Sequence, residues 1–264
     1  MKIDDDVVDQ KRKYALLLAA RDSDYVRMKY GGYFNVFVGV FGSEGEVWDL
    51  FRVVDGEFPE DEELNKYDGF IVSGSPYDAY GDDIWILRLC LLLRTLDFMK
   101  KKVIGVCFGH QVLCRALGGH VGKALGGWEV GIKQVTFVDD FLQYCPFMQD
   151  FHHIPHHASI IECHQDEVWE PPIDAKVIAY SEKTAVEAFC IDDHILGIQG
   201  HPEYTKDILD NLIGRLVDNN SIDMDFAEEA RKKMELVEPD RKFWEEMCRN
   251  FLKGRKERHS LLLC

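Results

Sequence analysis

The sequence predicts an α/β fold with a mostly parallel central sheet flanked by helices and a small antiparallel extension. Three observations favour it. Short apolar segments rich in valine and isoleucine alternate with helix-length segments in the first half of the chain, which is typical of parallel strands covered on both faces. After residue 130 the apolar segments become shorter, which predicts the antiparallel extension. The hydrophobic content of 46% is ample for a large core.

The first half of the chain is expected to hold the parallel strands and two helices. Residues 84–99 have helical length and apolar spacing, with Arg88 and Arg94 at polar positions. A second helix is expected directly after residue 106 and to end near Gly118 and Gly119. The strands are expected at residues 14–20, 33–40, 48–54, 70–72 and 103–106.

The second half is expected to contain short strands followed by a helical tail. The strands are expected at residues 131–138, 176–181, 185–191 and 195–199. The helices are expected at residues 206–219, 226–236 and 239–253, the last with a proline at its start. No linker separates two domains. We therefore expect an N-terminal extension over 1–13, one α/β domain over 14–219, and a C-terminal helical extension over 220–264 that packs on the same domain.

Composition excludes several classes of partner. The net charge of −16 over 264 residues argues against nucleic acid, because a phosphate-binding surface needs a concentrated basic face. No apolar run reaches the length of a membrane span, and the N-terminus has no apolar signal core. Eight cysteines without the spacing of a small disulfide scaffold fit free thiols in a reducing cytosol.

Cys107 is the most informative residue of the chain. It ends a short apolar strand, a helix is expected to begin at once, and Gly105 and Gly109 lie two residues to either side. This is the pattern of a nucleophile elbow, a sharp strand-to-helix turn that presents a reactive side chain. Glycines are needed because the backbone segments approach closely there. The helix N-terminus is expected to lower the thiol pKa. The alternative is a buried cysteine that acts as a small core residue.

A base for this cysteine is expected far along the chain, at His201. His201 follows a strand and precedes a helix, which places it at the same carboxyl edge of the sheet as Cys107. An imidazole can deprotonate the thiol and later protonate a leaving amine. Glu203 lies two residues on, across Pro202, and can orient the ring. The sequence therefore predicts a Cys107–His201–Glu203 triad.

The motifs around these residues resemble those of the class I (triad-type) glutamine amidotransferases, which have a flavodoxin-like fold. The resemblance covers roughly residues 14–216 and rests on the joint occurrence of the cysteine elbow and the His-Pro-Glu motif. The matching segments are residues 73–76, 105–111, 116–119, 128–131, 164–168 and 200–203. The whole chain, including its helical tail, looks most like the plant γ-glutamyl peptidases, stand-alone members that act on glutathione conjugates.

The resemblance implies roles for the remaining site residues. The backbone amides of Phe108 and of the Gly74-Ser75 turn would hold the oxyanion of a tetrahedral intermediate, and Gln111 would contact the glutamyl head. Ser75 stands where many relatives have glycine, so the turn is expected to be set differently. The reaction implied is cleavage of a γ-glutamyl bond of glutathione or its S-conjugates through a thioester on Cys107, with no metal and no cofactor.

Two alternatives to this peptidase remain open. The chain has no synthetase domain to receive ammonia, which favours a self-sufficient hydrolase with a small-molecule γ-glutamyl substrate and no obligatory synthetase partner. A glutaminase subunit that supplies ammonia to a separate synthetase is the first alternative. A non-catalytic regulatory relative is the second, although the intact Cys107, His201 and Glu203 argue against it.

A group of histidines is the last candidate for a site. His152, His153, His156 and His157 lie together around Pro155. Their spacing matches no zinc pattern with cysteine or acidic partners. We expect a loop with surface histidines near the pocket, whose rings could contact a substrate carboxylate.

Overall fold

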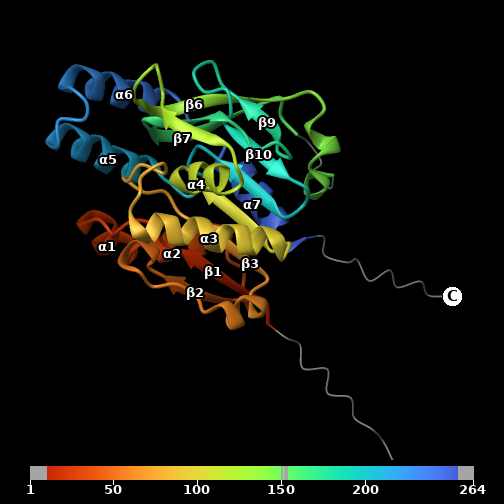
Figure 1. The fold of residues 1–264 in the computed structure, drawn as a ribbon. Coiled ribbons are helices and arrows are strands. Elements are labelled where there is room, and N and C mark those ends of the chain that lie inside the picture. Colours follow the sequence, from red (N-terminus) through yellow and green to blue (C-terminus); the bar gives the residue numbers. More distant parts are fainter. Residues whose placement is uncertain (1–10, 150, 152–153, 255–264) are drawn as a thin grey trace, which may run out of the picture.

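The computed structural model describes residues 11–149, 151 and 154–254, and within them a nine-stranded sheet forms the centre of the fold (Figure 1). One half of the sheet is parallel, in the order β2-β1-β3-β4-β11. Its strands are β1 (Lys13–Leu17), β2 (Val47–Phe51), β3 (Gly69–Val72), β4 (Lys102–Val106) and β11 (Ile195–Ile198). β3 and β11 are buried along their whole length, as expected for parallel strands covered on both faces.

The other half of the sheet is antiparallel and continues from β11 in the order β10-β9-β6-β7. These strands are β6 (Glu129–Phe137), β7 (His157–His164), β9 (Lys176–Tyr180) and β10 (Ala188–Ile191). A separate antiparallel pair joins β5 (His120–Lys123) to β8 (Asp166–Glu170). The predicted fold class is therefore confirmed, with a parallel region around Cys107 and an antiparallel extension.

Helices cover both faces of the sheet (Figure 1). They are α1 (Asp24–Tyr30), α2 (Tyr33–Phe41), α3 (Ile84–Phe98), α4 (Phe108–Ala116), α5 (Lys206–Asp218), α6 (Met224–Leu236) and α7 (Arg241–Lys253). Tyr14 and Leu16 of β1 pack in one hydrophobic cluster with residues of α2, α5, α6 and α7. Ala15 and Leu17 pack in the other cluster, with α3 and α4. This alternation is the two-residue period of a strand.

The expected strand at 33–40 is wrong, because these residues form helix α2. Its buried residues are Tyr33, Val36, Phe37, Val40 and Phe41, which is the spacing of one helix face. The segment is apolar almost throughout, so the strand and helix patterns could not be told apart from the sequence. The prediction also contained no elements at α1, β5, β7 and β8.

The C-terminal helices pack on the main core. Trp244 and Phe251 of α7 are almost completely buried, and α7 contacts β4, β7 and α2. α6 contacts α5 and β6. The division of the chain at residue 219 stays a prediction. In the described part of the chain, no helix is both long enough and apolar enough to cross a membrane.

Candidate active site

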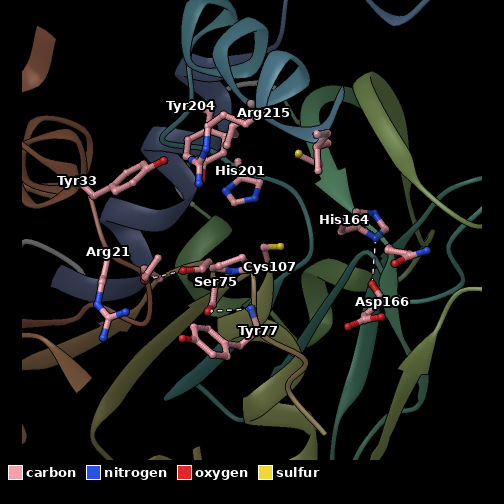
Figure 2. A pocket seen from close by; sticks show the side chains of 18 of the residues that line it. Arg21, Tyr33, Ser75, Tyr77, Cys107, His164, Asp166, His201, Tyr204 and Arg215 are labelled. Carbon is pink, nitrogen blue, oxygen red and sulfur yellow. Dashed lines mark hydrogen bonds between the residues drawn. The ribbon is translucent and has the colours of Figure 1, made fainter. Parts of the chain in front are cut away.

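A cavity of about 460 Å³ opens beside the carboxyl ends of the parallel strands (Figure 2). β3 leads into the turn at Ser73, β4 leads into Cys107, and β11 leads toward His201. Open α/β sheets bind ligands at this edge. The predicted site residues that line the cavity are Gly74, Ser75, Cys107, Gln111, His201 and Glu203.

Cys107 occupies a strained turn between β4 and α4. Its backbone has φ of 53° and ψ of −107°, a conformation that costs on the order of 1–3 kcal/mol for a residue other than glycine. A Cβ added at Gly105 would lie 2.3 Å from the carbonyl oxygen of Gly109, and one at Gly109 would lie 2.3 Å from that of Val72. Only glycine fits at these two contacts, so the elbow depends on both.

The expected lowering of the Cys107 pKa is wrong. Cys107 is 6% exposed, and burial raises the pKa of its thiol well above the ordinary value, with Cys163 and Glu162 adding to the rise. The backbone amide of Phe108 donates to the sulfur and lowers the pKa, as expected at a helix N-terminus. Desolvation outweighs this donor. The thiol is therefore protonated at neutral pH and needs a base.

His201 has the surroundings of such a base. Its backbone amide donates to the carbonyl of Ile161 at 2.8 Å, which ties the segment to β7. Its Nδ1 lies 2.8 Å from Glu203 Oε1, and both side chains are buried. The ring stacks on Tyr204, with centroids 3.9 Å apart and planes 3° from parallel. Two contacts thus fix the orientation of the imidazole and leave Nε2 for the cavity.

Gly74 lies between the imidazole and the nucleophile elbow. A Cβ at this position would lie 2.9 Å from Cε1 of His201, 3.7 Å from its Nε2, and 3.6 Å from Cβ of Cys107. His201 and Cys107 therefore approach the same small space from different strands (Figure 2). The geometry suits proton transfer between them, although the catalytic role of each residue stays a prediction.

The turn that follows β3 is fixed by serine hydroxyls. Ser73 Oγ accepts from the amide of Ala19 at 2.9 Å and donates to the carbonyl of Gly74 at 2.9 Å. Ser75 Oγ accepts from the amide of Tyr77 at 3.2 Å. Ser75 is not among the described non-glycine residues with positive φ. The serine therefore fits this turn without backbone strain, and the turn does not need the glycine of many relatives.

Gln111 is hydrogen-bonded to the segment at Asp166 that lines the cavity. Its Nε2 donates to the backbone carbonyl of Asp166 at 2.9 Å and to Gln199 Oε1 at 3.1 Å. His164 Nδ1 lies 3.0 Å from the same carbonyl of Asp166. The amide nitrogen of Gln111 is therefore engaged by the protein itself. Its predicted contact with a glutamyl head is not tested by this arrangement.

A cluster of buried acids lies next to His164. Its Nε2 is 3.3 Å from Glu162 Oε2 and 3.7 Å from Glu129 Oε2. Burial raises the pKa of Glu162 and of Glu187 well above the ordinary value. Burial also lowers the pKa of His164. We therefore expect Glu162 and Glu187 to be protonated at neutral pH and to add little negative charge beside the site.

We expect Asp166→Asn to stabilise the protein more at about pH 8 than at about pH 5. Burial, followed by repulsion from Asp78, raises the pKa of Asp166 from 3.8 to about 6. Stability from this group is thus present below the unfolded pKa and is lost as the pH rises through about 6. The rise of the pKa corresponds to a stabilisation by Asp166→Asn of about 3 kcal/mol at pH 8 and about 1.5 kcal/mol at pH 5, so the expected difference is about 1.5 kcal/mol. Asparagine keeps the backbone carbonyl that Gln111 and His164 contact.

Urea unfolding of the wild type and Asp166→Asn at the two pH values measures this difference. Asp139→Asn is the matched control, because Asp139 is exposed and the charge change is the same. An equal effect of Asp166→Asn at both pH values would contradict the assignment.

The structure adds cavity residues that sequence reasoning missed, namely Tyr33, Tyr204 and Arg215. Tyr33 begins the helix that was predicted as a strand. Tyr204 directly follows the His-Pro-Glu motif, and this position could have marked it as a residue of the site. Arg215 lies in the last turn of α5, and nothing in its sequence context marks it as a site residue.

The histidine group does not form part of the cavity as far as the structure describes it. His156 and His157 are exposed, His157 begins β7, and neither lines the cavity. The expected surface position is therefore confirmed for these two residues, and a contact with a substrate carboxylate stays a prediction. His152 and His153 lie outside the described residues. No group of three or more potential metal ligands occurs among the residues that the structure describes.

Comparison with known proteins gives the family. The sequence matches the family described as glutamine amidotransferase class-I over residues 50–215. A solved glutamine amidotransferase from Thermotoga maritima has the same fold, with a TM-score of 0.67, 21% identity, and coverage of 90% of this chain and 96% of that one. The chain belongs to the class I glutamine amidotransferase family.

Within that family the chain is similar over almost its whole length to named peptidases of Arabidopsis thaliana. Gamma-glutamyl peptidase 5 is 53% identical over 251 residues, which covers 95% of this chain and 99% of that protein. Gamma-glutamyl peptidase 3 is 50% identical, with coverage of 94% and 99%. The predicted resemblance to γ-glutamyl peptidases is therefore confirmed, and it includes the C-terminal helices.

Proposed function

We propose that the protein is a γ-glutamyl hydrolase that cleaves glutathione or glutathione S-conjugates through a thioester on Cys107. One observation carries the proposal: an imidazole oriented by Glu203 and Tyr204 faces the cysteine of a nucleophile elbow across Gly74. The names of the Arabidopsis relatives support the γ-glutamyl substrate. Glutathione carries a γ-glutamyl group, and its hydrolysis releases a peptide amine as the leaving group.

In the first half of the proposed reaction, Cys107 is acylated and the peptide amine leaves. His201 Nε2 takes the thiol proton while Cys107 Sγ bonds to the γ-carbonyl carbon, and the oxygen becomes an oxyanion. We propose that the backbone amides of Phe108 and of the turn at Gly74 and Ser75 hold that charge. One such donor is typically worth about 3 kcal/mol. The C–N bond then breaks as His201 returns the proton to the leaving amine.

The second half of the reaction releases glutamate. A water molecule attacks the γ-glutamyl thioester, and His201 takes its proton. The C–S bond breaks and Cys107 recovers its proton. Because the thiol pKa is raised by burial, proton transfer to His201 must accompany attack. We propose that the reaction takes place in the cytosol without a synthetase partner, and the free thiols of the described cysteines are consistent with a reducing compartment.

A panel of substrates tests this function. The rates to compare are those for glutathione, S-hexylglutathione, γ-glutamylcysteine and glutamine, each followed by release of glutamate. We expect kcat/KM for the best peptide substrate to exceed that for glutamine by about tenfold or more. A preference for glutamine would instead support the ammonia-supplying glutaminase. No turnover of any of the four would contradict the proposal.

Gly74→Ala is expected to lower kcat/KM by about 10²-fold, because a displacement near 1 Å in an active site can have this effect. The added Cβ would lie 2.9 Å from His201 Cε1, so the imidazole must move away from Cys107. Gly39→Ala is the matched control, since a Cβ there meets nothing within 4 Å. Steady-state kinetics of both variants measures the effect, and wild-type kcat/KM in Gly74→Ala would show that the turn does not set the position of His201.

A further inference from the structure

The positive charges of the cavity are few. Of the described residues that line it, Arg21 and Arg215 alone carry a permanent positive charge, in a chain of net charge −16. Arg21 is already paired, since its Nε and Nη2 donate to Asp55 Oδ1 at 3.0 and 2.8 Å. Arg215 has no carboxylate within 4 Å among the residues that the structure describes. Arg215 is therefore the guanidinium available to an anionic ligand.

Arg215 lies on the His201 side of the cavity. It belongs to α5, and two other residues of this helix, Leu212 and Leu216, also line the cavity. In Figure 2 the side chains of Arg215, Tyr204 and His201 lie in the same part of the view, away from His164 and Asp166, and the ring of Tyr204 stacks on His201. Burial raises the pKa of the Tyr33 hydroxyl, and the Arg215 charge opposes that rise. Arg215 thus acts on the part of the cavity that Tyr33 and Tyr204 line.

The proposed reaction requires the leaving group to occupy this side. His201 must donate a proton to the leaving amine, so the amine must lie next to the imidazole. We expect the remainder of the leaving group to extend from there toward α5, because Tyr204 and Arg215 also line the cavity. An extended dipeptide spans about 7 Å. Such a dipeptide ends in a free carboxylate, and a guanidinium is the side chain that best matches a carboxylate.

We propose that Arg215 binds the C-terminal carboxylate of the leaving peptide and thereby selects γ-glutamyl substrates whose leaving group is an amino acid or peptide with a free carboxylate. This inference rests on the proposed function and adds a specificity residue on α5. It explains why a site with the head-binding features of a glutaminase would favour a peptide over glutamine, which offers no carboxylate on this side.

Binding to an inactive protein tests the inference separately from turnover. Calorimetry in the Cys107→Ala background would compare glutathione with its glycyl ethyl ester, in which a neutral ester replaces the C-terminal carboxylate. We expect the ester to bind about tenfold more weakly, as for loss of a charged hydrogen bond. Adding Arg215→Gln should weaken the binding of glutathione by the same factor and leave the binding of the ester unchanged. Arg231→Gln is the matched control, because Arg231 pairs with Asp210 outside the cavity.

Each outcome bears on the inference. Equal binding of glutathione and the ester to Cys107→Ala would overturn it. If Arg215→Gln weakened the binding of glutathione, its ester and glutamine equally, the inference would also be overturned. Arg215 would then bind the carboxylate of the glutamyl head. In the active protein, Arg215→Gln should raise KM for glutathione with little change in kcat. Absence of turnover with preserved selective binding would overturn the proposed function alone.

Discussion

Cys107→Ala is expected to lower the rate of glutathione hydrolysis by about 10⁴-fold or more, since the nucleophile of a covalent mechanism is lost. The fold should remain, because alanine keeps the Cβ and places the same demand on the positive φ at this position. Steady-state kinetics and thermal unfolding of the variant measure the two effects. A glutamine-like electrophile should label the wild type and not Cys107→Ala.

Cys163 provides the control for this variant. It is the other described cysteine that lines the cavity, and it lacks the glycine-flanked turn. Cys163→Ala should keep labelling and most of the turnover. Equal labelling of the wild type and Cys107→Ala would mean that another thiol is the nucleophile.

His201→Gln is expected to lower kcat by about 10²- to 10⁴-fold, the contribution of a positioned general base. The thiol needs this base because burial raises its pKa. Labelling of Cys107 by the electrophile should be slower than in the wild type but still detectable, because the sulfur is present. Rapid-quench measurement of the first turnover would show whether the loss falls on formation of the thioester.

A second histidine gives the matched control. His120 is exposed on β5 and pairs with Glu170, away from the cavity. His120→Gln should therefore leave kcat unchanged. A His201→Gln variant that turns over at the wild-type rate would remove His201 from the mechanism and leave Glu203 and Tyr204 without their proposed positioning roles.

The sequence was informative wherever a local pattern has one physical solution. The glycines around Cys107 predicted a close backbone approach, and the contacts of Gly105 and Gly109 confirm it. The parallel strands around the elbow were predicted because each is a short apolar run bounded by a helix or a turn. The position of His201 followed from the carboxyl edge of such a sheet.

The remaining features depend on tertiary contacts. Residues 33–41 are apolar almost throughout, so their spacing fits a buried strand as well as a helix. Packing against the core decides in favour of the helix. The Cys107 pKa depends on how much of the thiol is buried, which no local motif reports. Arg215 lines the cavity because the C-terminal half of α5 packs beside the site. No spacing along the chain connects it with Cys107.

The most direct test of the account is to trap the acyl-enzyme. The wild type would be mixed with excess glutathione, quenched with acid within one turnover, digested with a protease and analysed by mass spectrometry. The account predicts one added γ-glutamyl group, equal in mass to glutamate less water, on the peptide that contains Cys107. The adduct should be absent from Cys107→Ala. It should accumulate in the wild type when attack of water on the thioester is slower than formation of the thioester. Burst-free turnover with no adduct on Cys107 at any quench time, or an adduct on a different residue, would contradict the account.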